Sequence, residues 1–168
     1  MSKVFELDQI AFELITAKLE TQRNDIQNLR NQAAISAAVT GLLATVFASV
    51  AEATGASTMI LGNDFLGFTI NGILLISCIT LSLAFSVMVV VSWSEFTFSF
   101  DALKLLEKGR NSHSHGEFFE EYVRDGEWFF KDNESKLSLA QNQLWWAMVL
   151  GWVQIAPWLL IIVGKENV

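Results

Sequence analysis

Cysteine is nearly missing from this chain, which has a single one, Cys78, among 168 residues. One thiol excludes an intrachain disulfide and a cysteine-rich zinc site. Gly-rich phosphate loops, nucleophile elbows and HExxH helices are also missing. His113 and His115 are too few to hold a metal and are expected to be solvated in a loop. We therefore expect no enzyme activity, no metal and no cofactor.

Charge is missing from three long apolar stretches, which are 33–50, 66–93 and 144–164. A helix of about 20 apolar residues crosses the hydrocarbon core of a bilayer. Without Asp, Glu, Lys, Arg or His inside these stretches, a proton-coupled carrier or an intramembrane protease is disfavoured. A hydrophobic fraction of 52% and a charged fraction of 17% fit an integral membrane protein.

The predicted fold class is an all-α integral membrane protein with three transmembrane helices. Long cytoplasmic helical extensions of these helices are expected to form a helical bundle. The chain is predicted to be a single membrane domain in five segments. They are a cytoplasmic helix at 1–32, span one at 33–52, span two at 66–93, a cytoplasmic helical hairpin at 94–143 and span three at 144–164.

Basic residues are scarce, and their distribution indicates the orientation. Ten of the eleven lie before the first span or between the second and third, and only Lys165 follows the third. Basic residues are retained on the cytoplasmic side, so we expect a cytoplasmic N-terminus and three crossings. The first thirty residues have no apolar core of a signal peptide, so the first span is expected to direct insertion. A net charge of −7 argues against a nucleic-acid polymer as partner.

The residues before the first span predict a long helix. Residues 4–32 contain neither Gly nor Pro. Their apolar positions are spaced by four and three residues, with Asp8 and Gln22 as polar interruptions. The series consists of Phe5, Phe12, Ile15, Leu19, Ile26, Leu29 and Ala33. One continuous helix is expected from residue 4 to residue 52, with this series packed on the chain's own cytoplasmic helices or on neighbouring subunits.

Small residues recur every four positions in the first span, and a second row flanks them. Such stripes let helix backbones approach closely inside a membrane. We predict that they form an oligomer interface or line a pore, and packing within the chain is the alternative. The stripe is Ala33, Ala37, Gly41, Thr45 and Ser49, and the flanking row includes Ser36 and Thr40.

Three further residues of the spans are candidates for an interface or a pore. Asn71 lies near the outer end of span two and either faces headgroups or bonds across helices. Gln154 lies near the centre of span three, and Pro157 is expected to kink that span because it has no N–H to donate. A polar residue beside a kink marks a pore or gate, or an interhelical hydrogen bond that fixes packing.

The cytoplasmic hairpin is predicted to have two helices. The helix of span two is expected to continue past Trp93 as far as Gly109, and the second helix to run from Glu117 toward Gln143. A break is expected near Gly126 or at 132–135. Aromatic residues of the second helix either fill the core of the bundle or dock a cytosolic partner protein. The docking candidates are Phe119, Tyr122, Trp128 and Phe129.

The layout resembles that of small transmembrane effectors of bacterial antiphage systems, of the Pycsar-type and SLATT-like groups. The matching features are the charged helix that enters a small-residue span (LRNQAAISAAVTGLLA), the short outer loop, and the charged segment that leads to the last span (ESKLSLAQNQLWWAMVLG). The resemblance implies an oligomer that disrupts the inner membrane when its cytoplasmic helices receive a signal. A small anionic nucleotide is a candidate signal, with Arg23, Arg30 and Arg124 as candidate contacts.

Two functions are consistent with these features. The first is an oligomeric pore-forming or membrane-disrupting effector in antiphage defence, gated through its cytoplasmic helices. The alternative is a non-conducting membrane anchor or regulatory subunit that docks a cytosolic partner. The expected partners are membrane lipid, further copies of the chain, and a cytosolic protein or small nucleotide.

Overall fold

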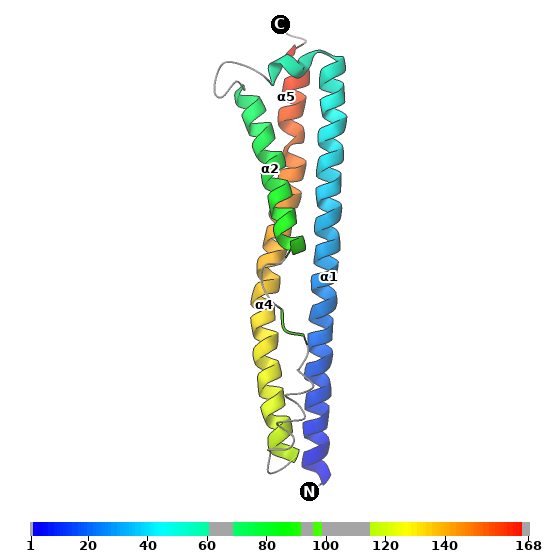
Figure 1. Ribbon diagram of the computed structural model, residues 1–168, viewed down its shortest axis with the longest axis vertical. Helices are drawn as coiled ribbons and strands as arrows, with labels where there is room; N and C mark the ends of the chain where they lie inside the picture. Colours follow the sequence, from blue (N-terminus) through cyan, green and yellow to red (C-terminus); the bar gives the residue numbers. More distant parts are fainter. Residues whose placement is uncertain (1, 61–68, 92–95, 99–114, 166–168) are drawn as a thin grey trace. The chain divides into compact units, whose positions relative to one another are not determined.

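The computed structural model describes residues 2–60, 69–91, 96–98 and 115–165, and these ranges are helical with short connections and no strand (Figure 1). The elements are α1 (Ser2–Ala53), the 3-10 helix η1 (Ala56–Met59), α2 (Ile70–Val91), α4 (His115–Val153) and α5 (Ile155–Lys165). Three segments are long and apolar enough to cross a membrane, namely Gln9–Ala53, Ile70–Val91 and Glu117–Gly164. The prediction of an all-α fold with three such helices is confirmed.

Helix α1 has 52 residues and runs without interruption from Ser2 to Ala53, close to the predicted range of 4–52. No Pro interrupts it, and Gly41 is its one glycine. The helix ends where Gly55 takes a left-handed conformation with φ 68°. Glycine adopts this conformation at little steric cost, so it is the usual residue just past the end of a helix.

The turn between α1 and α2 is held by Thr69 and Ile60. The Thr69 N–H donates to the Ile60 carbonyl at 3.0 Å, and the Gly72 N–H donates to Thr69 Oγ1 at 3.2 Å. Thr69 thus caps the start of α2. A methyl group on Gly72 would lie 2.5 Å from the Ile60 oxygen, so this approach requires glycine. Helix α2 starts at Ile70, later than the predicted residue 66; residues 66–68 lie outside the described ranges.

The predicted continuation of the second apolar helix to Gly109 is wrong where the structure describes it. Residues 96–98 are not helical. The Asn133 side chain donates to the Thr97 carbonyl at 2.8 Å and accepts from the Thr97 N–H at 3.2 Å. This pair of bonds replaces the helical partners of the Thr97 backbone. The rest of the predicted continuation, 92–95 and 99–109, lies outside the described residues.

Helix α4 runs unbroken from His115 to Val153, so the break predicted near Gly126 or at 132–135 is wrong. Asp132 and Lys136 form an ion pair of 2.6 Å across one helical turn. Asn133 uses its amide on Thr97 and does not compete with the backbone of its own helix. Both interactions let polar residues remain inside the helix.

The interruption lies instead at Gln154, where α4 ends and α5 begins. Pro157 follows three residues later and has no N–H to donate to the Val153 carbonyl. Hydrogen bonds from the Gln154 and Trp158 N–H groups, of 3.2 and 3.3 Å, continue the helical pattern on both sides. The last apolar helix is therefore interrupted next to Pro157, and a bend of its axis stays a prediction.

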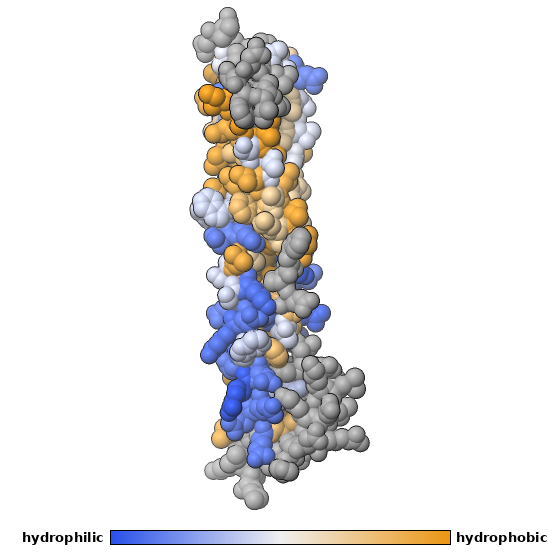
Figure 2. All heavy atoms as spheres, turned by 60° about the vertical axis from the view of Figure 1, so that its left-hand side comes forward, coloured by the Kyte–Doolittle hydropathy of each residue, from blue (hydrophilic) through white to orange (hydrophobic). Residues whose placement is uncertain are grey.

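The chain forms two compact units. Unit 1 contains 1–28 and 93–139, and unit 2 contains 29–92 and 140–168. The visible surface of unit 1 is mostly hydrophilic and that of unit 2 is mostly hydrophobic (Figure 2). This difference is what a protein with one aqueous and one membrane-embedded part would have.

The core of unit 1 lies between α1 and α4, which run in the same direction. The Phe12 ring lies 5.8 Å from the ring centroids of both Phe119 and Tyr122. Further along, Lys18 Nζ lies 3.0 Å from Glu127 Oε1, and the Gln22 amide donates to the Phe130 carbonyl at 3.0 Å. The buried residues of α1 in this unit are Ile15, Leu19, Gln22 and Ile26. The described residues of the predicted apolar series therefore pack on the chain's own helices, and the side chain of Phe5 lies outside the described residues.

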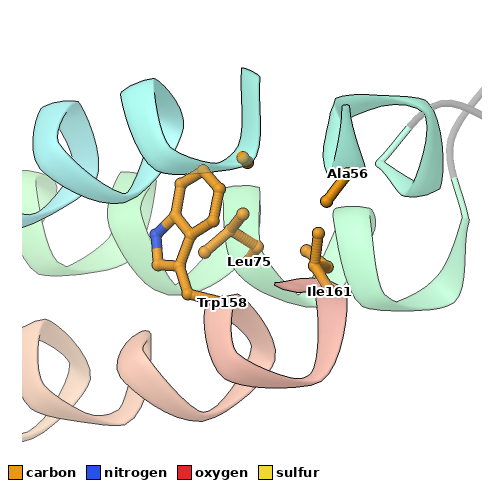
Figure 3. Close-up of a cluster of buried hydrophobic side chains, with 5 residues drawn as sticks. Ala56, Leu75, Trp158 and Ile161 are labelled. Carbon is orange, nitrogen blue, oxygen red and sulfur yellow. The ribbon is translucent and has the colours of Figure 1, made fainter. Parts of the chain in front are cut away.

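The core of unit 2 includes a cluster of large and small apolar side chains (Figure 3). The Trp158 indole stacks on Phe47 with the ring centroids 5.9 Å apart and the planes at 15°. The cluster consists of Ala51, Ala56, Leu75, Trp158 and Ile161. It joins α1, η1, α2 and α5 at one end of the apolar helices.

Leu19 and Leu14 allow a matched test of the packing of unit 1. Replacing Leu19, which is 1% exposed, with Ala should lower the free energy of unfolding by about 2–5 kcal/mol because it leaves a cavity. Replacing Leu14, which is 58% exposed on the same helix, should cost about 0.5 kcal/mol or less. The midpoint of thermal unfolding in detergent, followed by circular dichroism, measures both. Equal shifts for the two variants would contradict the packing.

Candidate functional site

Three polar side chains are buried together in unit 2. They are Thr40 on α1, Ser82 on α2 and Gln154 between α4 and α5, and at most 1% of each is exposed. Their surroundings are apolar helices, where a polar atom without a partner is costly. We call these three residues the polar layer.

Two hydroxyl groups of the polar layer form a short chain of hydrogen bonds. Ser82 Oγ donates to the Ala147 carbonyl at 2.7 Å, and it lies 3.1 Å from Thr40 Oγ1. A serine hydroxyl has one proton. Since that proton is directed at Ala147, Thr40 must be the donor to Ser82. The chain of bonds connects α1, α2 and α4.

The Gln154 side chain completes the polar layer. Its amide Nε2 donates to the Gly151 carbonyl at 2.8 Å and to the Thr40 carbonyl at 3.4 Å. Because the dielectric constant of an apolar interior is low, each such bond holds the helices more firmly than it would at a surface. Gln154 therefore ties the junction of α4 and α5 to α1.

Gly151 allows α4 to approach the polar layer closely. A methyl group at this position would lie 2.7 Å from Thr40 Oγ1 and 3.4 Å from Ser82 Oγ. Thr40 is stiff because its side chain is β-branched, and its hydroxyl is already bonded to Ser82. Glycine is therefore the residue that fits.

A groove of about 280 Å³ lies beside the polar layer in unit 2. Exposed apolar side chains stand at its rim, including Ile35 and Trp152, which are 63% and 65% exposed. Its lining consists of Gln32, Ile35, Ser36, Val39, Thr40 and Leu43 of α1 with Met148, Gly151 and Trp152 of α4.

The outer surface of α1 in unit 2 has two different faces. One face has large exposed side chains, namely Ile35, Val39, Leu42, Val46 and Val50. The other, which we call the small face, consists of Ala34, Ala38, Gly41, Thr45 and Ala48, all exposed or half-exposed. A methyl group on Gly41 would meet no heavy atom of the chain within 4 Å. The small face therefore lies open in the single chain.

The predicted stripe of small residues crosses from the core to the surface. Ala33 is fully buried, Ala37 and Gly41 are half-buried, and Thr45 and Ser49 are exposed. The hydroxyls of Thr45 and Ser49 donate to carbonyls one turn back, at 2.8 and 3.0 Å. With 3.6 residues per turn, a strict spacing of four rotates by about 40° at every step. The stripe is therefore not one surface.

The other predicted residues of the apolar helices are likewise divided between the core and the surface. Thr40, Gln154 and Pro157 are buried in unit 2, and Ser36 is half-buried in the groove. Asn71 is exposed at the second position of α2. Of the alternatives for Gln154, the structure contains the hydrogen bond between helices.

The predicted aromatic residues are mostly core residues of unit 1. Tyr122 is 3% exposed, and Phe119 and Phe129 are half-buried. Trp128 differs, because 64% of it is exposed even though its ring lies 5.5 Å from that of Phe129. Within this set, Trp128 is the residue that presents a large apolar surface to the outside.

The candidate contacts for a metal or a nucleotide are not drawn together in the described part of the chain. No group of three metal-ligating side chains occurs there, and His113 lies outside it. Arg124 is exposed and pairs with Glu120 at 2.9 Å on its own helix, while Arg23 is exposed and Arg30 half-buried on α1.

Ser82, Asn133 and Gln22 have structural roles that the sequence did not assign as sites. Ser82 belongs to a row of buried residues on α2 that are three and four positions apart. The helical periodicity of the sequence could therefore have identified it as buried. The row is Leu75, Cys78, Ser82, Ser86 and Val89. Asn133 has no comparable local signal, because its partner Thr97 lies in a different segment.

These features define an all-helical protein with three helices of membrane-spanning length and composition, which is the arrangement of a multi-pass membrane protein. No family model, no curated protein and no solved structure matches the chain.

Gly151 and Gly164 allow a matched test of the polar layer. Gly151→Ala should lower the stability of unit 2 by about 1–3 kcal/mol, because the new methyl group overlaps the Thr40 hydroxyl. Gly164→Ala, whose methyl group meets nothing within 4 Å in the chain, should leave the stability unchanged or slightly raised. Thermal unfolding of both variants in detergent measures the difference. Equal stability of Gly151→Ala and Gly164→Ala would contradict the close approach of Gly151 to the Thr40 hydroxyl.

Proposed function

We propose that this chain is an oligomeric protein of the bacterial inner membrane that forms a pore or disrupts the bilayer as an effector in antiphage defence. In this proposal its N-terminus lies in the cytoplasm, because this orientation puts ten of its eleven basic residues on the cytoplasmic side of the membrane. The observation that carries the proposal is the open small face of α1, at Ala34, Ala38, Gly41, Thr45 and Ala48.

The small face suits contact between helices better than contact with lipid. Its residues are spaced alternately by four and three, so they stay on one side of α1. Small side chains let two helix backbones approach closely, and dispersion contacts then drive association where hydrophobic burial cannot. The bulky face beside it offers lipid the ordinary surface of a membrane helix. A second copy of the chain is the partner we propose for the small face.

The interior of a single chain supports a permeation path between copies and not through one chain. Thr40, Ser82 and Gln154 are buried and bonded to one another or to neighbouring carbonyls. A lumen would need these polar groups to face water. Assembly through the small face leaves the interior of each chain intact and places the path at the contacts between chains.

The cytoplasmic unit is the proposed receiver of the activating signal. Helices α1 and α4 both run without interruption from the residues of unit 1 into those of unit 2. In this proposal, a change of packing in unit 1 alters, through the continuous chain of these helices, the contacts that unit 2 makes with other copies. A small nucleotide is the candidate signal implied by the resemblance to antiphage effectors.

Replacing Gly41 with Leu tests the proposal. The Cβ of the new side chain has space in the single chain, so the fold should remain intact. Its bulk should separate two paired α1 helices, and each 1.4 kcal/mol of lost packing weakens association about tenfold. We expect loss of the oligomer in native membranes, and at least a tenfold loss of dye leakage from liposomes. Val46→Leu, on the bulky face, should change neither.

An unchanged oligomer and unchanged leakage in Gly41→Leu would contradict the proposal. If the Gly41→Leu variant lost the oligomer but kept full leakage, assembly through the small face would stand and its role in permeation would fall.

The second candidate function is a non-conducting membrane anchor that holds a cytosolic partner, and the 64% exposure of Trp128 favours it. Exposed tryptophans are frequent among the residues that dominate protein interfaces. In this case Trp128→Ala, and not Gly41→Leu, should abolish the biological effect while leaving the unfolding midpoint unchanged. Retention of the effect in Trp128→Ala would exclude docking through this residue.

A further inference from the structure

Four buried polar atoms of unit 2 have no hydrogen-bond partner among the residues that the structure describes, namely Arg30 Nε, Ser86 Oγ, Gln154 Oε1 and Trp158 Nε1. Two of them come from residues four positions apart, the carbonyl oxygen of the Gln154 side chain, Oε1, and the indole N–H of Trp158, Nε1. The two residues are 0% and 3% exposed. Buried polar groups are almost always hydrogen-bonded, so each of these atoms requires a partner.

Neither atom can find its partner by a simple rotation. The Gln154 amide is fixed by the bonds of Nε2 to the Gly151 and Thr40 carbonyls. The Trp158 ring is fixed by its stacking on Phe47. Ser86 Oγ is also unpaired and buried, but a serine hydroxyl can turn to a carbonyl of its own helix. Gln154 and Trp158 therefore differ from Ser86.

Gln154 lies between α4 and α5, and Trp158 lies in the first turn of α5. Gln154 and Trp158 are four residues apart, and the backbone N–H of Trp158, not its indole, donates to the Gln154 backbone carbonyl at 3.3 Å. Residues spaced in this way have Cβ atoms about 5–6 Å apart. In Figure 3 the indole nitrogen lies on the side of the ring away from Ile161. Since α5 runs toward Ile161, the nitrogen lies on the side of the ring toward the N-terminal end of α5.

The chemistry of the pair restricts what can bind between them. Gln154 Oε1 accepts hydrogen bonds and the indole N–H donates them. A metal cation would satisfy only the glutamine, and an anion would satisfy only the indole. A guest that satisfies both must donate and accept, which is the property of a hydroxyl compound. In a closely packed interior, the smallest such compound is water.

We propose that a single water molecule is bound between Gln154 and Trp158 in the interior of unit 2. The water donates one proton to Gln154 Oε1 and accepts the indole N–H of Trp158. Its second proton is available to the Val153 carbonyl, to which Pro157 offers no N–H. The site belongs to the single chain, so it is independent of assembly through the small face and of the proposed function.

The test uses the full-length protein in lipid nanodiscs, perdeuterated and labelled with ¹⁵N-tryptophan. Nuclear Overhauser effects between each indole proton and water are measured, and Trp158→Phe identifies the Trp158 resonance among those of the six tryptophans. We expect a cross-peak to water at Trp158. Trp152, which is 65% exposed on the outside of the same apolar helix, should give none and serves as the control for general water entry.

A second variant connects the signal to Gln154. Gln154→Met has a side chain of similar length without the carbonyl oxygen, and it should abolish the Trp158 cross-peak while the other five indole resonances stay in place. The proposal is overturned if the wild-type protein gives no Trp158 cross-peak, or if Trp158 and Trp152 give equal ones. It is also overturned if the cross-peak survives in Gln154→Met. Running the same measurement on Gly41→Leu keeps this result separate from the question of assembly.

Discussion

The arrangement of the apolar helices depends on how polar groups find partners where water is scarce. Thr40 on α1 donates a hydrogen bond to Ser82 on α2, and Ser82 donates to the Ala147 carbonyl on α4. The side-chain amide of Gln154, between α4 and α5, donates to the Thr40 carbonyl on α1. A sliding of any one helix would leave several buried atoms unpaired, at a cost of about 1–3 kcal/mol each. Gly151 makes the arrangement possible because any larger residue would overlap the Thr40 hydroxyl.

A closed interior has a consequence for function. When the polar groups of a small helical bundle are turned inward and bonded, the groups left for other molecules are those on its surface. On α1 that surface is divided into a bulky face and a small face, and the two suit different neighbours. Lipid packs well against large branched side chains, whereas a second helix gains from small ones. The proposed effector function is based on this division and on the resemblance in layout. The exposed Trp128 supports the second candidate, a non-conducting membrane anchor that holds a cytosolic partner.

Local sequence was sufficient to predict the long helices, the disturbance of the last apolar helix beside Pro157 and the packed series on the N-terminal helix, because each depends on residues within a few turns. It misplaced the small face, since a strict spacing of four drifts around the helix from Ala33 in the core to Ser49 at the surface. Contacts between distant segments were beyond local reasoning. The Asn133 side chain binds the Thr97 backbone in the non-helical residues 96–98. No residue close to either one in the sequence predicts this contact.

The most direct measurement of the central claim, that α1 helices pair through the small face, is disulfide formation between copies in native membranes. The natural Cys78 is replaced with Ser, and single cysteines are placed at Ala38 or Thr45 on the small face and at Leu42 or Val46 on the bulky face. Two cysteines bond when their Cα atoms come within about 7 Å of each other. The account predicts cross-linked dimers from Ala38→Cys and Thr45→Cys, and monomers from Leu42→Cys and Val46→Cys. The reverse pattern, or equal cross-linking at all four positions, would contradict it.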